Sequence, residues 1–305
     1  MLLILFLLLA ACAGAQTAGT EPPVFRVGVS LVTIDAKVTG RDGRDIPNLN
    51  ANDFVIYDEG ERRTVSNFGR ESTPVEVLLV IDASPEMRPH LLDLTPHVME
   101  ALSPLRPGDR AGATVFGATS EVIAPLTTDL ADVPRKVVNN IYKDRYGRGT
   151  LVNEALVDAA AYLKREPAKG RRTVIVITNN RGVRSAVQDA DVVRALQGAD
   201  AVLNAIVIGE DAGPRTVLSA HAPGVAPPDV YRYARETGGD VVQGQDPAAA
   251  LRQIIAAAMT RYSLQFPAPS EANGYRRLRV ELSGAAHVKY PGATVQTRAG
   301  YELPK

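Results

Sequence analysis

The stretch VEVLLVIDASPE, residues 75–86, decides the fold. Its first part is an almost wholly apolar run that ends at Asp82, and such a run is typical of a strand buried on both faces of a parallel sheet. A loop with Ser84 and Glu86 follows, and the residues beyond it predict a helix. Strand, polar loop and helix in this order indicate the first unit of a doubly wound α/β domain, where ligands bind beyond the carboxyl ends of the strands.

The same alternation of strand and helix continues to about residue 262. Helical patterns such as TLVNEALVDAAAYLKRE and DPAAALRQIIAAAMTRY separate the apolar runs, and in the second pattern Asp246 is the expected N-cap with Pro247 at the first helical position. The strand candidates are VEVLLVID, RAGATVFG, EVIAPLTT, RRTVIVITNN, AVLNAIVIG and DVVQG. We therefore expect a doubly wound, mostly parallel sheet, of the Rossmann-like α/β class, over about residues 74–262.

Strand-like segments flank this domain on both sides. Residues 24–72 contain FRVGVSLVTIDAKVTG, which alternates with period two, and DFVIYDEGERRTVSNF, which predicts a hairpin that turns at Glu59 and Gly60. Residues 263–305 contain the strand candidates RRLRVELSG, AHVKYPG and TVQTRAGY. Each segment alone has too few strands to bury a core, so we expect the two to pack as one small β domain into which the α/β domain is inserted.

The N-terminus predicts export. MLLILFLLLAACAGAQ is a leucine-rich run too short for a permanent bilayer span, and it ends in small residues, so residues 1–15 are expected to be a signal peptide. LAAC also fits a lipobox with a lipid on Cys12, and an uncleaved anchor is a third alternative. The predicted location is periplasmic, outer-membrane-anchored or extracellular. Cys12 is the only cysteine, which excludes an intrachain disulfide.

The composition argues against several classes of partner. Lys plus Arg equals Asp plus Glu at 34 each, so no net charge attracts nucleic acid or an anionic membrane. Aromatic residues make up 5% of the chain and Trp is absent, which disfavours stacking on single-stranded nucleic acid. A membrane contact is expected only through an N-terminal lipid. The chain also contains no nucleophile elbow, His-Glu-x-x-His helix or phosphate-binding loop.

Three short motifs carry a resemblance. DASPE with Asp82, GRGTLVNEAL with Thr150 and VIVITNNRG with Asn179 resemble the Asp-x-Ser-x-Ser loop, the Gly-Thr loop and the strand-ending Asp of the metal-ion-dependent adhesion site in von Willebrand factor A domains. With its flanking β segments, the chain resembles the exported von Willebrand A-related proteins typical of acidobacteria. The resemblance implies a non-enzymatic protein that binds a protein or peptide partner in the cell envelope.

The resemblance also implies a ligand set, and two of its members depart from the family pattern. The implied metal ligands are Asp82, Ser84, Glu86, Thr150 and Asn179. Mg²⁺ prefers near-octahedral oxygen ligands at about 2.0–2.1 Å, whereas Glu86 replaces a Ser and Asn179 replaces an Asp. A site that still binds Mg²⁺ (or Mn²⁺ or Ca²⁺), a metal-free remnant that binds a partner, and a structural relic all remain open. We expect a degenerate site that binds Mg²⁺ weakly or not at all.

Neighbouring residues bear on that expectation. Arg145, Arg148 and Arg181 are expected on the same rim, where each can pair with the acidic side chains without a metal. Pro85 restricts the backbone of Ser84 and can change the path of the loop.

Two other functions are weighed against binding. One is a metal-dependent hydrolase at the same rim, for which Asp82, Glu86 and Glu154 are the nearby acids. The other is an envelope assembly factor that acts through edge pairing of its β segments.

Overall fold

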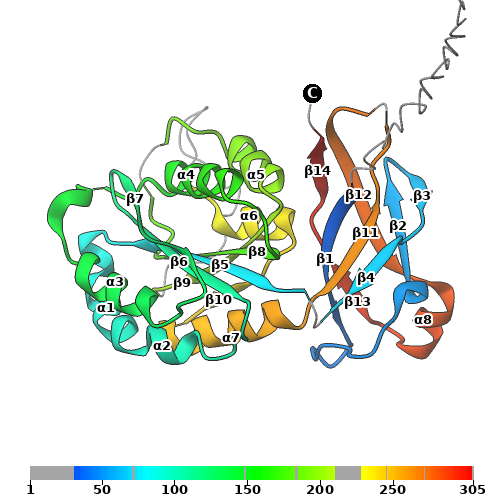
Figure 1. Ribbon diagram of the computed structural model, residues 1–305, viewed down its shortest axis with the longest axis horizontal. Helices are drawn as coiled ribbons and strands as arrows, with labels where there is room; N and C mark the ends of the chain where they lie inside the picture. Colours follow the sequence, from blue (N-terminus) through cyan, green and yellow to red (C-terminus); the bar gives the residue numbers. More distant parts are fainter. Residues whose placement is uncertain are drawn as a thin grey trace, which may run out of the picture.

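The computed structural model describes residues 31–303 except 71–72, 148, 183–184, 210–227, 245 and 271. The predicted signal peptide with Cys12 and the rim residue Arg148 lie outside the described residues. Within them, no helix combines the length and the apolar character needed to cross a membrane. Figure 1 shows an α/β body on the left and a β body on the right.

The centre of the α/β body is a six-stranded sheet with the order β10-β9-β8-β5-β6-β7. All neighbours pair in parallel except β6 and β7, which are antiparallel. The strands are β5 (Val75–Asp82), β6 (Arg110–Phe116), β7 (Ser120–Thr127), β8 (Arg171–Thr178), β9 (Ala201–Val207) and β10 (Val241–Gln243). Strands β5, β6, β8 and β9 are buried along their whole length, as their apolar runs predict.

Helices cover both faces of this sheet (Figure 1). Leu79 and Ile81 of β5 face one helical layer, while Leu78 and Val80 face the other. The first layer contains α1 (Arg88–Leu94), α2 (Val98–Ala101), α3 (Asp132–Asn140) and α7 (Pro247–Met259); the second contains α4 (Val152–Arg165), α5 (Asp189–Gly198) and α6 (Val230–Thr237). Asp246 caps α7 by accepting a hydrogen bond from the backbone N–H of Ala249 at 2.9 Å. The expected doubly wound fold is confirmed.

The β body is a sandwich built from both ends of the chain. One sheet has the order β13-β1-β11-β4 and the other β14-β12-β2-β3. The strands are β1 (Leu31–Thr39), β2 (Phe54–Asp58), β3 (Glu61–Arg63), β4 (Asn67–Gly69), β11 (Tyr262–Pro267), β12 (Gly274–Leu282), β13 (Thr294–Gln296) and β14 (Gly300–Leu303). Antiparallel pairing of β1 with β11 and of β2 with β12 joins the two flanking segments. The expectation of one β domain with the α/β domain inserted into it is therefore confirmed.

Local sequence explains one hairpin that was predicted correctly and one strand that was predicted where a helix forms. Glu59 and Gly60 both have positive φ, 51° and 88°, as a tight β2–β3 hairpin requires. The strand predicted for AHVKYPG is wrong, because this segment lies mostly in the helix α8 (Gly284–Lys289). The Ser283 hydroxyl caps that helix at the Ala286 N–H, 3.4 Å away, and Ala286 is buried against the sandwich.

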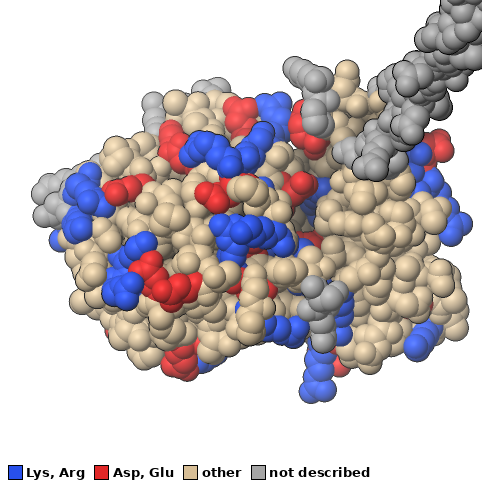
Figure 2. All heavy atoms as spheres, viewed as in Figure 1, with Lys and Arg blue, Asp and Glu red and all other residues tan. Residues whose placement is uncertain are grey.

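The chain crosses between the two bodies twice, after β4 and after α7. The limit expected at residue 262 falls on the first residue of β11, so the sandwich resumes almost directly after α7 ends at Met259. Basic and acidic side chains are interspersed over the face shown in Figure 2, in keeping with the zero net charge.

Candidate functional site

Asp82 ends β5 with its side chain fully buried. One carboxylate oxygen accepts a hydrogen bond from the Ser84 backbone N–H at 2.9 Å, and the other accepts one from the Thr178 hydroxyl at 2.8 Å. Strand register explains the second contact, because Ile81 lies opposite Ile177 and the next residues of β5 and β8 are therefore neighbours. Thr178 was not among the residues predicted for this site. Its position as the last residue of a parallel strand could have indicated that it lies at the same edge of the sheet.

The surroundings of Asp82 disfavour its negative charge. Burial raises the pKa of this carboxyl to about 6, although the hydrogen bonds from Ser84 and Thr178 act in the opposite direction. The Glu86 carboxylate adds to the rise by repulsion. A positive group nearby would relieve this cost.

Pro85 sets the path of the following loop. Ser84 is extended, with φ −56° and ψ 153°, and Pro85 begins the 3₁₀ turn η2 (Pro85–Met87). This turn buries Met87 and leaves Glu86 exposed. The Ser84 hydroxyl is buried and has no hydrogen-bond partner in the described part of the chain.

Two glycines bring the Thr150 loop against the strand ends. A Cβ at Gly117, just after β6, would lie 2.8 Å from the Tyr146 carbonyl oxygen, and one at Gly182 would lie 3.0 Å from the Thr150 carbonyl oxygen. The Leu151 N–H also donates to the Gly117 carbonyl at 2.9 Å. Close backbone approach at glycine therefore positions Thr150, which is itself buried.

These loops surround a cavity of about 1000 Å³ that we name the strand-end groove. Glu86, Thr150 and Asn179 line it, whereas Asp82 and Ser84 are buried and only their chain neighbours reach the wall. The full lining is Ala83, Pro85, Glu86, Arg88, Lys143, Tyr146, Gly147, Gly149, Thr150, Asn179 and Arg181. The structure thus brings the sequence-predicted residues to one edge of the sheet, and their role as metal ligands stays a prediction.

Basic side chains outnumber acidic ones along this groove, with Arg88, Lys143 and Arg181 against Glu86. Arg88 and Lys143 were not identified from the sequence, because their loops come together only in the folded chain. Of the arginines expected to be able to pair with Asp82 or Glu86, Arg145 pairs with Glu121 instead.

Arg145 turns away from the groove. Its guanidinium lies 2.6 Å from the Glu121 carboxylate and 5.4 Å from the centre of the Tyr146 ring. Glu154 also turns away, since it accepts hydrogen bonds from the Ser185 hydroxyl at 2.9 Å and the Ala186 N–H at 3.1 Å.

The donor set fits a divalent cation poorly, although the Ser84 hydroxyl, unpartnered among the described residues, is able to coordinate one. Both oxygens of Asp82 already accept hydrogen bonds, and the Asn179 side-chain oxygen accepts one from the Arg181 N–H at 2.9 Å. Glu86 is exposed on the groove wall. No group of three or more His, Cys, Asp and Glu side chains is placed to hold a metal within the described ranges. A compact Mg²⁺ shell here would require Glu86 to turn inward and Asn179 to share its side-chain oxygen between the metal and the Arg181 N–H.

Comparison with known proteins agrees with the fold. Residues 77–182 match the family model of the von Willebrand factor type A domain. An uncharacterized protein of Borreliella burgdorferi is 23% identical over 144 residues, which are 45% of this chain and 42% of that protein. The match thus spans well under half the length of that relative.

Solved structures resemble the chain at low identity and low TM-score. BatB from Bacteroides thetaiotaomicron, a conserved hypothetical protein, has a TM-score of 0.46 and 18% identity over 60% of this chain and 98% of its own. A von Willebrand factor type A protein from Catenulispora acidiphila has a TM-score of 0.47 and 14% identity over 92% of this chain and 76% of its own.

Proposed function

We propose that the von Willebrand factor type A domain in this chain is the recognition module of an exported, non-enzymatic binding protein, whose partner is a protein or peptide of the cell envelope. The observation that supports this proposal is the strand-end groove of about 1000 Å³. Its walls are loops fixed to buried strands, which is how rigid α/β scaffolds present variable contact residues.

The groove chemistry suits an acidic segment of the partner. Arg88, Lys143 and Arg181 can donate charge-assisted hydrogen bonds to a carboxylate, while Tyr146 and Pro85 add apolar surface. In this proposal the basic side chains take the place of a metal as the group that holds the partner's carboxylate. The poor fit of the donor set to Mg²⁺ supports that exchange.

Groove composition supports a non-enzymatic role over the hydrolase alternative. Neither His nor Cys occurs among the groove-lining residues, and Glu154 is engaged with the loop at Ser185. The described groove thus lacks the imidazole and the thiol on which many nucleophile–base pairs depend. A broad hydrolase screen tests this point, because reproducible turnover that is lost in Asp82→Ala would replace binding with catalysis.

The assembly alternative draws less support from the sandwich. Its edge strands are short, with three residues each in β3, β4 and β13 and four in β14, so they present few free backbone groups for pairing with another chain.

Site-specific photo-crosslinking in the native cell envelope tests the groove. A photoreactive amino acid at Lys143 or at Arg88, both exposed on the groove wall, should give one discrete crosslinked protein. The matched control carries the same group at Val288, which is 85% exposed on α8 of the sandwich. Adding Arg181→Glu should reduce the product several-fold. The same product from Val288, or no product from either groove position, would refute the proposed site.

A further inference from the structure

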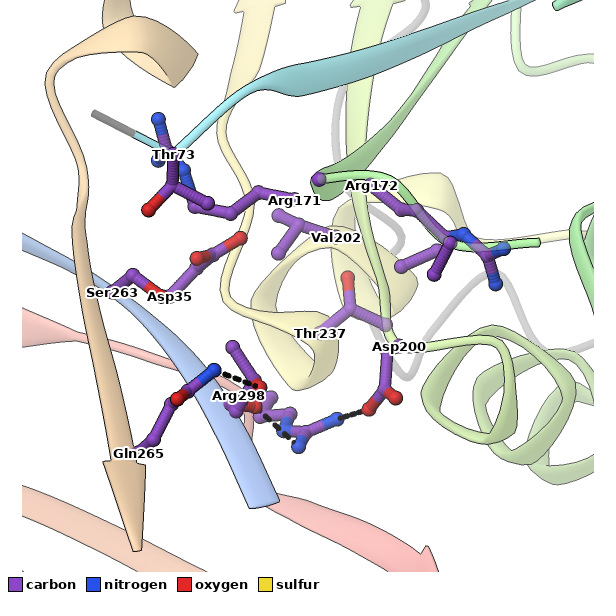
Figure 3. A pocket seen from close by; sticks show the side chains of 14 residues that line it. Asp35, Thr73, Arg171, Arg172, Asp200, Val202, Thr237, Ser263, Gln265 and Arg298 are labelled. Atoms are coloured by element: carbon purple, nitrogen blue, oxygen red, sulfur yellow. Dashed lines mark hydrogen bonds and ion pairs between the residues drawn. The ribbon is translucent and has the colours of Figure 1, made fainter. Parts of the chain in front are cut away.

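A second cavity, of about 240 Å³, lies between the sandwich and the amino ends of the α/β strands (Figure 3). We name it the interdomain cavity. Its lining residues are Thr33, Asp35, Thr73, Ala168, Gly170, Arg171, Arg172, Asp200, Ala201, Val202, Thr237, Ser263, Gln265 and Arg298. Nothing in the strand-end groove contributes to it, so it constitutes an independent site.

Strand alternation gives this cavity its polar floor. Val32, Ile34 and Ala36 of β1 point into the sandwich core, so Thr33 and Asp35 point to the other face. In the register with β11, Thr33 lies opposite Gln265 and Asp35 opposite Ser263. A polar sheet face that would ordinarily contact water is therefore covered by the α/β domain.

Two buried arginines approach the cavity from elsewhere. Arg171, which is 5% exposed, donates through one terminal nitrogen to the carbonyls of Ala258 at 3.0 Å and Arg261 at 3.2 Å. Arg298, which is 7% exposed, donates to the Asp200 carboxylate at 2.8 Å and the Thr33 carbonyl at 2.6 Å. In both arginines the Nε–H is buried and has no acceptor among the described residues.

Asp35 faces this pair without touching either member. Its Oδ1 atom is buried and unpartnered, and its carboxylate makes no ion pair within the described chain. Burial raises the pKa of Asp35, although the charges of Arg171, Arg261 and Arg298 act in the opposite direction. An unsatisfied buried polar atom is costly, so one acceptor and two donors without protein partners in a single cavity favour a guest molecule that satisfies them.

We propose that the interdomain cavity binds a small zwitterion that carries one ammonium and one carboxylate, the chemistry of a small α-amino acid. The ammonium donates to Asp35, and the carboxylate accepts from the Nε–H groups of Arg171 and Arg298. A lone cation would meet the two arginines and a lone anion would meet Asp35, whereas a zwitterion complements both. The volume of about 240 Å³ admits a ligand smaller than a typical drug-sized molecule.

Calorimetry and thermal unfolding of the full chain test this proposal with glycine, L-alanine and L-serine at millimolar concentration. These probes should bind saturably and raise Tm, because they bind the folded state alone. Methylamine, acetate and inorganic phosphate each supply only part of the required chemistry and should give no comparable shift. Asp35→Asn should weaken amino-acid binding at least tenfold and leave the ligand-free Tm unchanged or higher, since it removes a half-buried carboxylate that makes no ion pair in the described chain.

Two further variants complete the design. Asp42→Asn is the matched control, because Asp42 lies on an exposed turn of the same domain with its side chain 64% exposed, and it should bind like the native chain. Arg171→Lys keeps the charge, lacks the Nε–H and should weaken binding of the carboxylate. The proposal is overturned if the native chain binds none of the amino acids, if Asp35→Asn binds them undiminished, or if acetate, phosphate or methylamine alone matches their effect.

Discussion

Asp82 illustrates how the surroundings of a single residue govern its charge and its contacts. Its carboxylate is buried, its pKa is raised to about 6, and both oxygens are satisfied by the protein itself. Glu86, which the sequence offers as a substitute ligand, is exposed. The sequence predicts that the polar residues of this loop lie at one edge of the sheet. It does not predict the hydrogen bond between Thr178 and Asp82, because that contact depends on the register of β5 and β8.

The first prediction at this scale concerns metal. We expect Mg²⁺, Mn²⁺ or Ca²⁺ at millimolar concentration to leave the Tm of the chelator-treated chain nearly unchanged, because Asn179 offers a neutral oxygen in place of a carboxylate and Glu86 is exposed on the groove wall. Glu86→Ser combined with Asn179→Asp should create a metal-dependent rise in Tm. A clear rise in the native chain that disappears in Asp82→Ala would contradict the prediction.

The second prediction concerns a close backbone contact. A Cβ at Gly239 would lie 1.7 Å from the Leu203 carbonyl oxygen, so Gly239→Ala must displace β9 or the end of α6. We expect a loss of about 3 kcal/mol in the free energy of unfolding, measured with urea. Gly284→Ala is the control, because nothing lies within 4 Å of the added Cβ and the residue begins α8. Equal effects of the two substitutions would show that steric contact does not explain the loss.

At the scale of elements, one carboxylate in the sheet β14-β12-β2-β3 accepts hydrogen bonds from the three other strands. Asp58 of β2 is fully buried and accepts hydrogen bonds from Arg276 of β12 at 2.8 and 2.9 Å, from Arg63 of β3 at 3.2 Å and from the Tyr301 hydroxyl of β14 at 3.1 Å. One residue from each strand therefore meets at this point. Each alone looks like an ordinary charged or aromatic strand residue, so their convergence could not be predicted without the pairing.

This cluster predicts a dependence of stability on pH. Burial acts to raise the pKa of Asp58, but hydrogen bonds from Arg276 and Tyr301 and the charges of Arg276 and Arg63 outweigh it and hold the pKa below its usual value. The stabilisation is thus complete above the ordinary carboxyl pKa of about 4 and is lost as the pH falls through the lower folded value.

The test is Asp58→Asn. This variant should lose about 2 kcal/mol at neutral pH, because it removes the buried acceptor of the charge-assisted hydrogen bonds from the half-buried Arg276 and Arg63, and its difference from the native chain should shrink below about pH 4. Urea unfolding from neutral to acidic pH measures both effects, with Asp42→Asn as a surface control. A difference that stays constant over the whole pH range would exclude an ionised Asp58 as the cause.

The secondary-structure elements also show which structures hydrophobic periodicity does not predict. Long apolar runs such as β5 and β8 could be placed because burial on both faces leaves few other structures for them. The segment after Ser283 was assigned as a strand from its neighbours, although a capping hydroxyl and two alanines favour the short helix that forms. Such short elements follow local capping, which periodicity alone does not reveal.

At the scale of the whole molecule, charged contacts hold the inserted domain against the sandwich. Asp240, which follows α6, lies 3.0 Å from Lys37 of β1 and 3.2 Å from Arg261, the residue before β11. The insertion itself was predictable from the two flanking segments that were each too small to fold alone. The residues at the interface, including those of the interdomain cavity, could not be predicted, because they come from strands and loops far apart in sequence.

Asp240→Ala should weaken this junction. We expect a loss of about 2 kcal/mol, since Arg261 is buried and would keep its charge without that partner, and earlier protease cleavage between the domains. Asp191→Ala removes an exposed pair with Arg194 and should cost less than about 1 kcal/mol. Urea unfolding followed by limited proteolysis measures both; if the two variants behave alike, the Asp240 contacts do not secure the junction.

The pairing of β1 with β11 also determines how the molecule responds to mechanical force. A pull that enters through the chain before Leu31 draws β1 toward its amino end, while resistance from the α/β domain enters at Tyr262 and draws β11 toward its own amino end. Because the strands are antiparallel, these pulls are opposed and run along the strand axes. The inter-strand hydrogen bonds lie across that axis, so from Leu31–Pro267 to Ala36–Tyr262 they are strained together in shear instead of opening one after another. A chain held at its amino end and pulled at its inserted domain would thus resist extension through the longest pairing between its two flanking segments.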